Sequence, residues 1–324
     1  VVVGPVCYLT VMIEPADELQ RVHVHPGGQG FWIARMVHTL GCDAVLVAPI
    51  GGEAGVALTH LAPTWGVTMR GVAIARPSPT QVNDRSSGER VELVAAGEPV
   101  LDRHEADDLY GAVLEASLAA DVVVLTAGTG RSFPIDSYRR LVGDLIARGV
   151  RIVGDLHGEA LGAALDGVDG NGRGVAGRGI DVLKVSSEDL IADGWTIRDE
   201  SDAVEAAVRL CARSRGAVVV SRAEDPAVAI VGDRVVRITP PRMSVADHRG
   251  AGDSMTGAIA AARVHGLDRF DSIRLGAAAG AGNVTRHGLG SGNAGLIGEL
   301  LELVDVTEVA RTSAIDRPAT EEHR

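Results

Sequence analysis

Aromatic residues are scarce in this chain of 324 residues, where Phe, Trp and Tyr together make up 3% of the sequence. Cysteine is scarce as well, because Cys7, Cys42 and Cys211 are the only three and no two of them have Cys-x-x-Cys spacing. An odd, scattered set of cysteines argues against a structural zinc site and favours a reducing, cytoplasmic location. No apolar run reaches the roughly 18 residues that a membrane span needs, so we expect no contact with a membrane.

Positively charged residues are also fewer than negatively charged ones. Lys and Arg number 31 against 43 Asp and Glu, which gives a formal net charge of −12 and a pI of about 5.3. This balance argues against nucleic acid and against an anionic membrane surface as partners. Hydrophobic residues make up 46% of the chain, and its length is enough for one large α/β domain or for two domains.

One stretch stands out, Arg249-Gly250-Ala251-Gly252-Asp253, which precedes a long apolar run. This order predicts a glycine turn that opens a helix, and the free N–H groups at a helix start attract anions such as phosphate. Asp253 would oppose an anion, but it suits a base that takes the proton from a hydroxyl attacking phosphorus. On these residues alone, an ordinary glycine-rich turn with an aspartate at the helix start explains the pattern equally well.

Strands and helices alternate along most of the chain. Helical spacing at 31–40 and 53–65 flanks a buried-type strand at 43–50, which is typical of a parallel sheet with crossover helices. The alternation resumes near residue 105, and Gly232-Asp233 predicts a hairpin turn. Three helices are expected near the C-terminal end, at 253–266, 269–286 and 293–301.

The alternation is interrupted between residues 67 and 98. Residues 67–75 and 90–94 have strand composition with no helix between them, and 77–88 has the Pro, Ser, Asn and Gly content of a turn region. We therefore expect an antiparallel pair that joins the strand near 21–25 in a small separate sheet.

With these motifs placed, the chain resembles the ribokinase-like (PfkB) carbohydrate kinase family over nearly its whole length. One signature is His25-Pro26-Gly27-Gly28-Gln29-Gly30, and the other is Gly250-Ala251-Gly252-Asp253-Ser254. Within the family, the segment Lys184–Asp189 makes the chain most similar to the 1-phosphofructokinases and tagatose 6-phosphate kinases.

The resemblance implies an α/β fold, with a three-layer αβα core around a mostly parallel sheet and a small β-sheet lid. Residues 1–15, 26–67 and 98–311 would form the core, 16–25 and 68–97 the lid, and 312–324 a disordered tail. Lids of this family often pair with the lid of a second subunit, so the resemblance implies a homodimer.

The resemblance also implies transfer of the γ-phosphoryl group of ATP to a hydroxyl of a sugar or sugar phosphate, with Mg²⁺ and, as a further candidate, a monovalent cation. Asp253 would be the base, beside an anion hole formed by the turn at Gly250, Ala251 and Gly252. The implied substrate residues are Asp17, Glu18, Gly27, Gly28, Gln29 and Trp32. The implied nucleotide residues are Lys184, Ser186, Ser221, Arg249, Gly252 and Asn283, and Asp189 would organise the metal.

Several positions depart from the family pattern. Gln29 replaces a lysine, Trp32 replaces an asparagine, and Pro79 stands where the lid often carries an arginine for the substrate phosphate, although Arg85 and Arg90 are near. These departures leave open a kinase for an unphosphorylated sugar or polyol, and a catalytically weak sensor. A nicotinamide-dependent oxidoreductase is a further alternative, but the chain lacks its Gly-x-Gly-x-x-Gly motif. The convergence of two or more arginines on the lid-side pocket would favour a phosphorylated acceptor.

Overall fold

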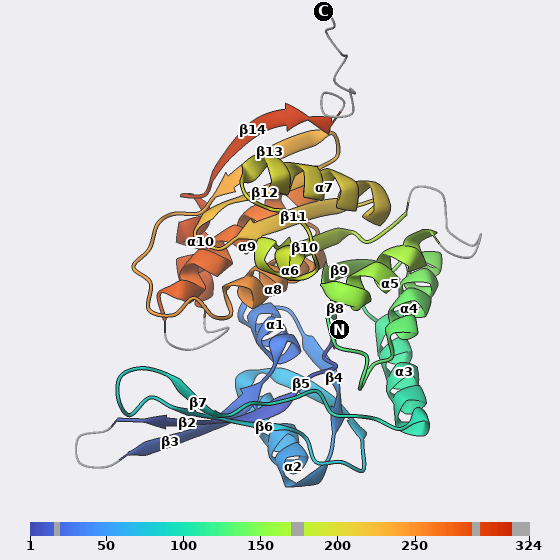
Figure 1. Ribbon diagram of the computed structural model, residues 1–324, viewed down its shortest axis with the longest axis vertical. Coiled ribbons are helices and arrows are strands. Elements are labelled where there is room, and N and C mark those ends of the chain that lie inside the picture. Colours follow the sequence, from blue (N-terminus) through green and yellow to red (C-terminus); the bar gives the residue numbers. More distant parts are fainter. Residues whose placement is uncertain (16–19, 170–177, 287–291, 313–324) are drawn as a thin grey trace, which may run out of the picture.

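The computed structural model describes residues 1–15, 20–169, 178–286 and 292–312. Within these residues the chain forms a ten-stranded sheet and a separate four-stranded sheet (Figure 1). The strand order of the large sheet is β14-β13-β12-β11-β10-β9-β8-β1-β4-β5. Every described helix is too short or too polar to cross a bilayer.

The large sheet is parallel over seven neighbouring strands and antiparallel over the last three. The parallel strands are β1 (Val2–Val3), β4 (Ala44–Ile50), β5 (Val67–Ala73), β8 (Val122–Thr126), β9 (Arg151–Asp155), β10 (Val182–Ser186) and β11 (Ala217–Arg222). The antiparallel strands are β12 (Asp225–Val231), β13 (Arg234–Thr239) and β14 (Asp305–Arg311). The hairpin predicted at Gly232-Asp233 is confirmed, whereas β14 was not predicted.

Helices cover both faces of this sheet, because neighbouring strand residues point to opposite sides. Val2 and Leu46 lie in one apolar core, while Val3 and Val47 lie in the other. The first core is closed by α1 (Gln29–Thr39), α8 (Ala251–Val264), α9 (Arg269–Val284) and α10 (Ala294–Leu301). The second is closed by α3 (Arg103–Leu118), α4 (Ile135–Arg148), α5 (Gly158–Asp169), α6 (Ser187–Ala192) and α7 (Glu200–Ser214). The predicted three-layer αβα architecture is confirmed.

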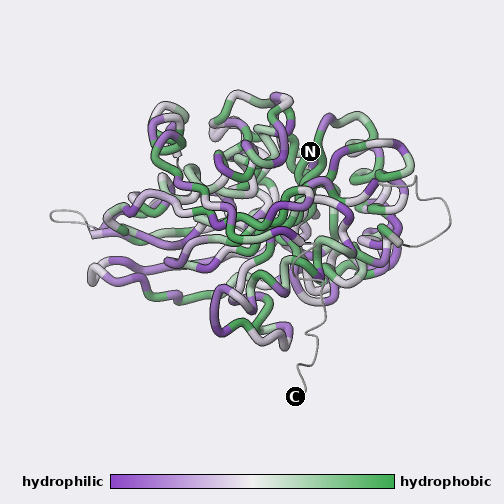
Figure 2. The backbone as a smooth tube through the Cα atoms, turned by 90° about the horizontal axis from the view of Figure 1, so that it is seen from above, coloured by the Kyte–Doolittle hydropathy of each residue, from purple (hydrophilic) through white to green (hydrophobic). Residues whose placement is uncertain are grey.

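The small sheet has the order β3-β2-β6-β7, formed by Arg21–Gly27, Tyr8–Glu14, Thr80–Asp84 and Val91–Val94 respectively. It projects from one side of the core (Figure 2). Its strand β6 lies inside 77–88, the stretch that was predicted to be a turn region. The strand forms there because it pairs in parallel with β2 along five residues, which outweighs its turn-like composition.

Two strand assignments from the sequence are wrong. Residues 67–73 form β5, which extends the large sheet parallel to β4, and not the lid. The helix α2 (Gly52–Leu61) connects these two strands, as expected of a β-α-β crossover. Residues 8–14 form β2 of the small sheet and not a core strand. The large-sheet strand β1 ends at Val3, ahead of Gly4 and Pro5, and proline cannot donate a ladder hydrogen bond.

Candidate functional site

The N-terminus of α8 is built differently from those of α3, α7 and α9. Those three helices begin after an aspartate, Asp102, Asp199 or Asp268, whose carboxylate accepts a backbone N–H of the first turn. Helix α8 begins after Gly250, which has φ of 75° and provides no side-chain cap. The amides of the first turn of α8 are therefore available to an anion.

Hydrogen bonds from buried polar side chains support this turn. Asn283, fully buried in α9, donates from Nδ2 to the carbonyl oxygen of Arg249 at 2.7 Å. Its Oδ1 accepts the hydroxyl of Ser254 at 3.1 Å. Asn283 was predicted to border the nucleotide, but its side chain supports the backbone of the glycine turn.

Lys184 lies directly below the turn. Its Nζ donates to Asp155 Oδ1 at 3.0 Å, and the two side chains are 6% and 4% exposed. The second oxygen of Asp155 accepts the hydroxyl of Thr256 at 2.7 Å. A Cβ on Gly252 would lie 2.9 Å from Lys184 Nζ, so the lysine ammonium approaches the turn closely at this residue. The chain's one lysine thus brings a buried positive charge to the base of the proposed anion hole.

Asp253 is the titratable group that these neighbours affect most. Burial and, to a smaller extent, the charge of Asp155 raise its pKa to about 7, against the opposing effect of Lys184. The residue keeps part of its surface exposed, as a group that must meet a substrate requires. A carboxylate with a pKa near neutrality is well suited to general-base catalysis.

A cavity of about 310 Å³ opens between the small sheet, α1 and the short helix Ala62–Trp65. The small sheet presents the polar face of β2 and β3 to it, through alternate residues such as Thr10 and His25. The lining residues are Tyr8, Thr10, Met12, Glu14, His23, Val24, His25, Trp32, Arg35, Trp65, Gln81, Arg85 and Arg90. Three of them are arginines.

Arg90 is held in place by its neighbours on the sheet. Its Nε donates to Asn83 Oδ1 at 2.8 Å and its Nη2 to Gln81 Oε1 at 3.3 Å. The pKa of Arg90 is lowered by burial and by the positive charges of Arg249 and Arg85. Crowded arginine charges of this kind are well suited to bind an anion.

Arg35 is oriented by aromatic rings. Its guanidinium carbon lies 4.1 Å from the ring centroid of Trp65 and 5.8 Å from that of Trp32. Trp32 is only 3% exposed and packs edge-on against Phe31 and Trp65, so it forms the floor of the cavity rather than an open stacking platform. Burial and the charge of Arg286 lower the pKa of Arg35 to about 10.

Tyr8 connects the cavity with the glycine turn. Burial raises the pKa of its hydroxyl, the negative charge of Asp253 raises it further, and Arg90 opposes this. Tyr8 lines the cavity, and its pKa responds to the charges of both Asp253 and Arg90.

Of the first glycine motif, His25 lines the cavity, whereas its glycines pack tightly against neighbouring residues. A Cβ on Gly27 would lie 2.5 Å from Thr10 Oγ1, and one on Gly28, where φ is 105°, would lie 2.3 Å from the Val6 carbonyl oxygen. Gly27, Gly28 and Gln29 are not among the cavity-lining residues. The predicted substrate residues Asp17 and Glu18 lie outside the described residues.

The predicted metal and nucleotide residues follow two neighbouring strands. Ser186 and Ser221 are cross-strand partners at the carboxyl ends of β10 and β11. Ser186 donates to Asp189 Oδ2 at 2.6 Å and accepts the Asp189 amide. The described chain contains no group of three or more His, Cys, Asp or Glu side chains arranged for a metal. A partly exposed carboxylate such as Asp189 nonetheless fits Mg²⁺, which uses one or two carboxylates together with substrate phosphates.

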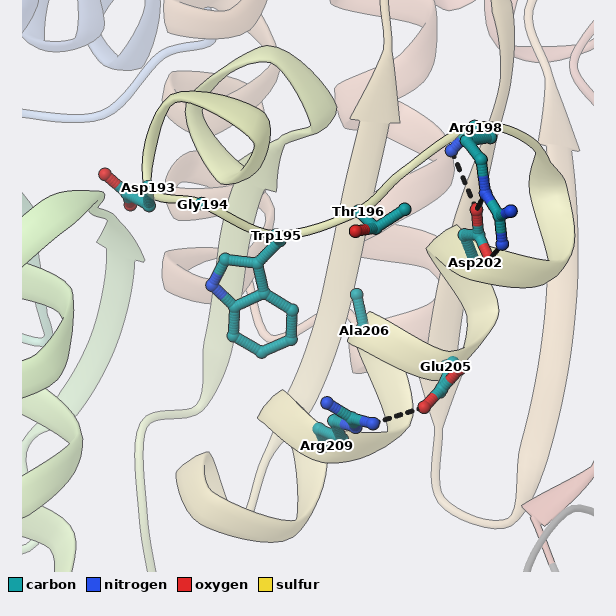
Figure 3. A pocket seen from close by; sticks show the side chains of 9 residues that line it. All are labelled: Asp193, Gly194, Trp195, Thr196, Arg198, Asp202, Glu205, Ala206 and Arg209. Carbon is teal, nitrogen blue, oxygen red and sulfur yellow. Dashed lines mark hydrogen bonds and ion pairs between the residues drawn. The ribbon is translucent and has the colours of Figure 1, made fainter.

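A larger cavity, of about 650 Å³, lies elsewhere, between α6 and α7 (Figure 3). Its two arginines are already paired, Arg198 with Asp202 at 2.9 Å and Arg209 with Glu205. None of its lining residues was predicted to be functional, whereas the lining of the smaller cavity includes the predicted substrate residue Trp32.

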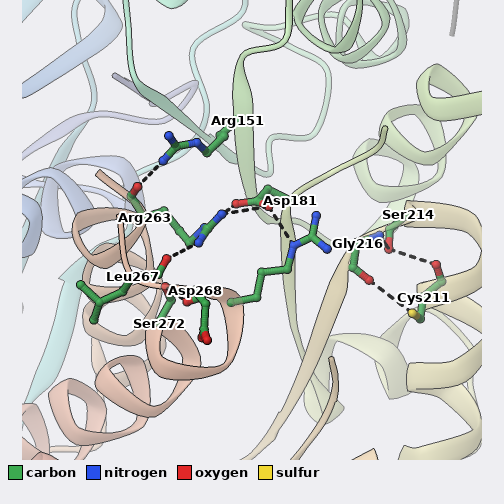
Figure 4. A network of polar contacts seen from close by, with 10 residues as sticks. Arg151, Asp181, Cys211, Ser214, Gly216, Arg263, Leu267, Asp268 and Ser272 are labelled. Atoms are coloured by element: carbon green, nitrogen blue, oxygen red, sulfur yellow. Dashed lines mark hydrogen bonds and ion pairs between the residues drawn. The ribbon is translucent and has the colours of Figure 1, made fainter. Parts of the chain in front are cut away.

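The far end of α8 is anchored by a network around Asp181, at the amino end of β10 (Figure 4). Asp181, whose side chain is 9% exposed, accepts Arg263 Nε at 2.6 Å and Arg269 Nε at 2.9 Å. These arginines flank the turn from α8 to α9. The network therefore fixes the position of α8 from the end opposite the glycine turn.

We expect Asp181→Asn to lower the free energy of unfolding by about 3 kcal/mol, because it leaves two arginine charges without their buried partner. Urea denaturation would measure the change. The matched control is Asp233→Asn, which breaks an ion pair with Arg311 in which both side chains are 62% exposed. The control should cost less than about 0.5 kcal/mol, and equal losses for the two variants would contradict the anchoring role.

Sequence reasoning missed Tyr8, Asp155 and Trp65. Asp155 has the clearest signal, because it is an acid that ends a buried strand, and ligands of α/β proteins bind at the carboxyl ends of strands. Tyr8 and Trp65 carry only the signal of being aromatic residues in a chain that has few.

The chain is similar in sequence to known carbohydrate kinases. Residues 176–294 match the family model described as pfkB family carbohydrate kinase. The ATP-dependent 6-phosphofructokinase isozyme 2 of Escherichia coli is 28% identical over 287 residues, which covers 86% of this chain and 89% of that protein. The 1-phosphofructokinase of Rhodobacter capsulatus is 29% identical over 279 residues and covers 81% of this chain and 82% of the relative.

The fold is shared with solved structures. The crystal structure of phosphofructokinase-2 from E. coli in complex with potassium superposes with a TM-score of 0.80 at 22% identity. The match covers 93% of this chain and 97% of that one.

Proposed function

We propose that this chain, which is similar to pfkB family carbohydrate kinases, transfers the γ-phosphoryl group of ATP to a hydroxyl of a sugar phosphate. The observation that carries the proposal is the convergence of Arg35, Arg85 and Arg90 on one cavity, which the ion pair between Arg85 and Asp247 joins to the segment before the glycine turn. An unphosphorylated sugar or polyol would offer no anion to these three charges. Phosphate recognition by arginine is charge-assisted and can be bidentate.

In the proposed mechanism the acceptor spans the site from the arginines to Asp253. Its phosphate would lie at Arg85 and Arg90, and its reacting hydroxyl at Asp253, which takes the proton. The first-turn amides of α8, with Lys184 below them, would stabilise the charge on the transferred phosphoryl group. Asp189 would help to hold Mg²⁺, which neutralises phosphate charge when bound. The small sheet would exclude water from the reacting groups.

An acceptor screen tests this proposal. ADP release would be measured with MgATP and with fructose, fructose 1-phosphate, fructose 6-phosphate and tagatose 6-phosphate. We expect turnover with at least one phosphorylated sugar and a lower kcat/KM with its unphosphorylated form. Turnover that prefers the unphosphorylated sugar would favour the polyol kinase, and binding without turnover on any acceptor would favour the sensor.

Arg90→Gln is expected to raise the KM for the phosphorylated acceptor by about 10–100-fold, since a hydrogen bond between charged groups contributes about 1.5–3 kcal/mol. The KM for ATP should change little, because the nucleotide lies on the other side of Asp253 in this mechanism. Arg76→Gln, at an exposed position ahead of β6, is the matched control. Equal KM changes for the two variants would remove Arg90 from the acceptor site.

We also propose that the small sheet pairs with that of a second copy. The face turned away from the cavity carries valines on three strands: Val22 (58% exposed), Val91 and Val94 (both 49%), and Val82. Covering such a face would remove apolar area from water.

Light scattering should accordingly give a dimer for the wild type and a mass near 33.5 kDa for the double variant Val22→Asp, Val91→Asp. Val56→Asp, at a 62% exposed valine on α2, is the control. A wild type that is monomeric, or a double variant that remains dimeric, would refute this interface.

A further inference from the structure

One ion pair joins the small sheet to the loop that leads into the glycine turn. Arg85 Nη2 lies 2.7 Å from Asp247 Oδ2, across 162 residues of sequence. The side chains are only 17% and 11% exposed, so water screens the pair weakly. Most ion pairs on the surface of this chain are far more exposed, as between Arg70 and Glu115.

At one end of this pair, Arg85 is fixed to the small sheet. It follows β6 directly, and its amide donates to the carbonyl oxygen of Ile13 in β2 at 2.7 Å. Its side chain also lines the acceptor cavity together with Arg90. A guanidinium has five N–H donors, so Arg85 can hold Asp247 and still present donors to an anion in the cavity.

At the other end, Asp247 is fixed to the backbone of the glycine turn. Its Oδ1 accepts the amide of Arg249 at 3.0 Å, and the Asp247 amide donates to the carbonyl oxygen of Val284 at the end of α9. The carbonyl of Arg249 is in turn held by Asn283. Asp247 does not line the cavity, so it can affect the acceptor only through Arg85 or through the turn.

Separation of the small sheet from the core would break the pair and leave two desolvated charges, which is unfavourable. The position of the sheet against the core and the shape of the turn at Arg249–Gly250 therefore stabilise each other. We propose that Arg85 is a positioning residue that couples closure of the small sheet over the acceptor to the shape of the anion hole, through Asp247. The catalytic part of this inference rests on the proposed kinase function, whereas the coupling itself does not.

The coupling predicts that kcat changes more than the KM for ATP. Asp247→Asn keeps the shape of the side chain and removes its charge, so kcat should fall about tenfold while the KM for ATP changes less than about threefold, within the range of pair couplings of this kind. The double variant Arg85→Gln, Asp247→Asn should be no slower than Arg85→Gln alone. Arg85→Lys, which keeps the positive charge, should have a higher kcat than Arg85→Gln.

Hydrogen exchange tests the coupling without turnover, on full-length protein without nucleotide or acceptor. We expect Arg85→Gln to increase amide exchange about tenfold both at residues 80–85 and at residues 249–254, although the substitution is only in the small sheet. Asp247→Asn should do the same from the other end. Arg70→Gln, in the exposed pair, should leave both segments unchanged.

Exchange that increases only around the substituted residue would overturn the coupling, whatever the acceptor screen gives. If the acceptor screen fails while both segments respond together, the coupling stands and the proposed kinase function falls. Melting curves of each variant would confirm that the comparison is made on folded protein, and Arg85→Lys provides a milder variant if Arg85→Gln does not fold.

Discussion

Replacing Asp253 by asparagine is expected to lower kcat by about 10²–10⁴-fold, the usual loss when a positioned base is removed. Asparagine has nearly the same size and can still occupy the first turn of α8, but its amide cannot accept a proton from the acceptor. The KM for ATP should remain close to that of the wild type, because the first-turn amides and Lys184 are unchanged. A coupled ADP-release assay under saturating MgATP would give both constants.

The same substitution should make the protein more stable at alkaline pH. The pKa of Asp253 is raised to about 7, well above the value of about 3.9 for an unfolded aspartate. The folded state therefore binds this proton more tightly than the unfolded chain does, so stability falls as the pH rises from about 4 to about 7 and stays at the lower value above pH 7. Asp253→Asn removes this penalty, which is at most about 4 kcal/mol.

Melting temperatures at pH 5 and pH 8 would measure the effect on stability. We expect the difference between the variant and the wild type to be larger at pH 8. Loss of activity together with loss of stability at pH 8 would instead indicate that Asp253 is a structural residue.

Lys184→Met is expected to lower the free energy of unfolding by about 3–5 kcal/mol, because it leaves the buried carboxylate of Asp155 without its cation. Asp155→Asn should cost a similar amount, since it strands the charge of Lys184. The double variant should cost less than the sum of the two, because neither charge then remains unpaired. Arg209→Met, which breaks an exposed pair with Glu205, is the control and should cost less than about 1 kcal/mol.

The two single variants should move the pH dependence of the rate in opposite directions. Lys184 lowers the pKa of Asp253, so its removal should shift the midpoint to higher pH. Asp155 raises that pKa, so its removal should shift the midpoint to lower pH. Shifts in the same direction would mean that the electrostatic coupling between these groups is not the one described.

The glycine turn and the αβα core could be predicted from sequence because both depend on local signals. Gly250 and Gly252 precede an uninterrupted apolar run, and the strands of the core are continuous buried stretches. The small sheet could not be placed as well. Its strand β6 is stabilised by pairing with β2, which is about 70 residues away along the chain, and no local pattern reveals such a partner.

The acceptor cavity was the least predictable part. Arg35 is turned into the site by Trp32 and Trp65, and Arg90 by Gln81 and Asn83. These contacts come from α1, a short helix and the small sheet, so only the folded chain brings the arginines together. The altered residues Gln29 and Pro79 made a phosphate site uncertain, whereas three arginines from other positions restore positive charge to the cavity.

The most direct test of this account is the pH dependence of kcat/KM for the preferred phosphorylated sugar, from pH 5.5 to 9, in the wild type and in Asp253→Asn. The account predicts that the wild-type value rises with pH to a plateau, with a midpoint near the pKa of about 7. It also predicts that the variant is about 10²–10⁴-fold slower at the plateau and has lost this midpoint. A variant that keeps the wild-type rate and midpoint would contradict the role of Asp253 as the base.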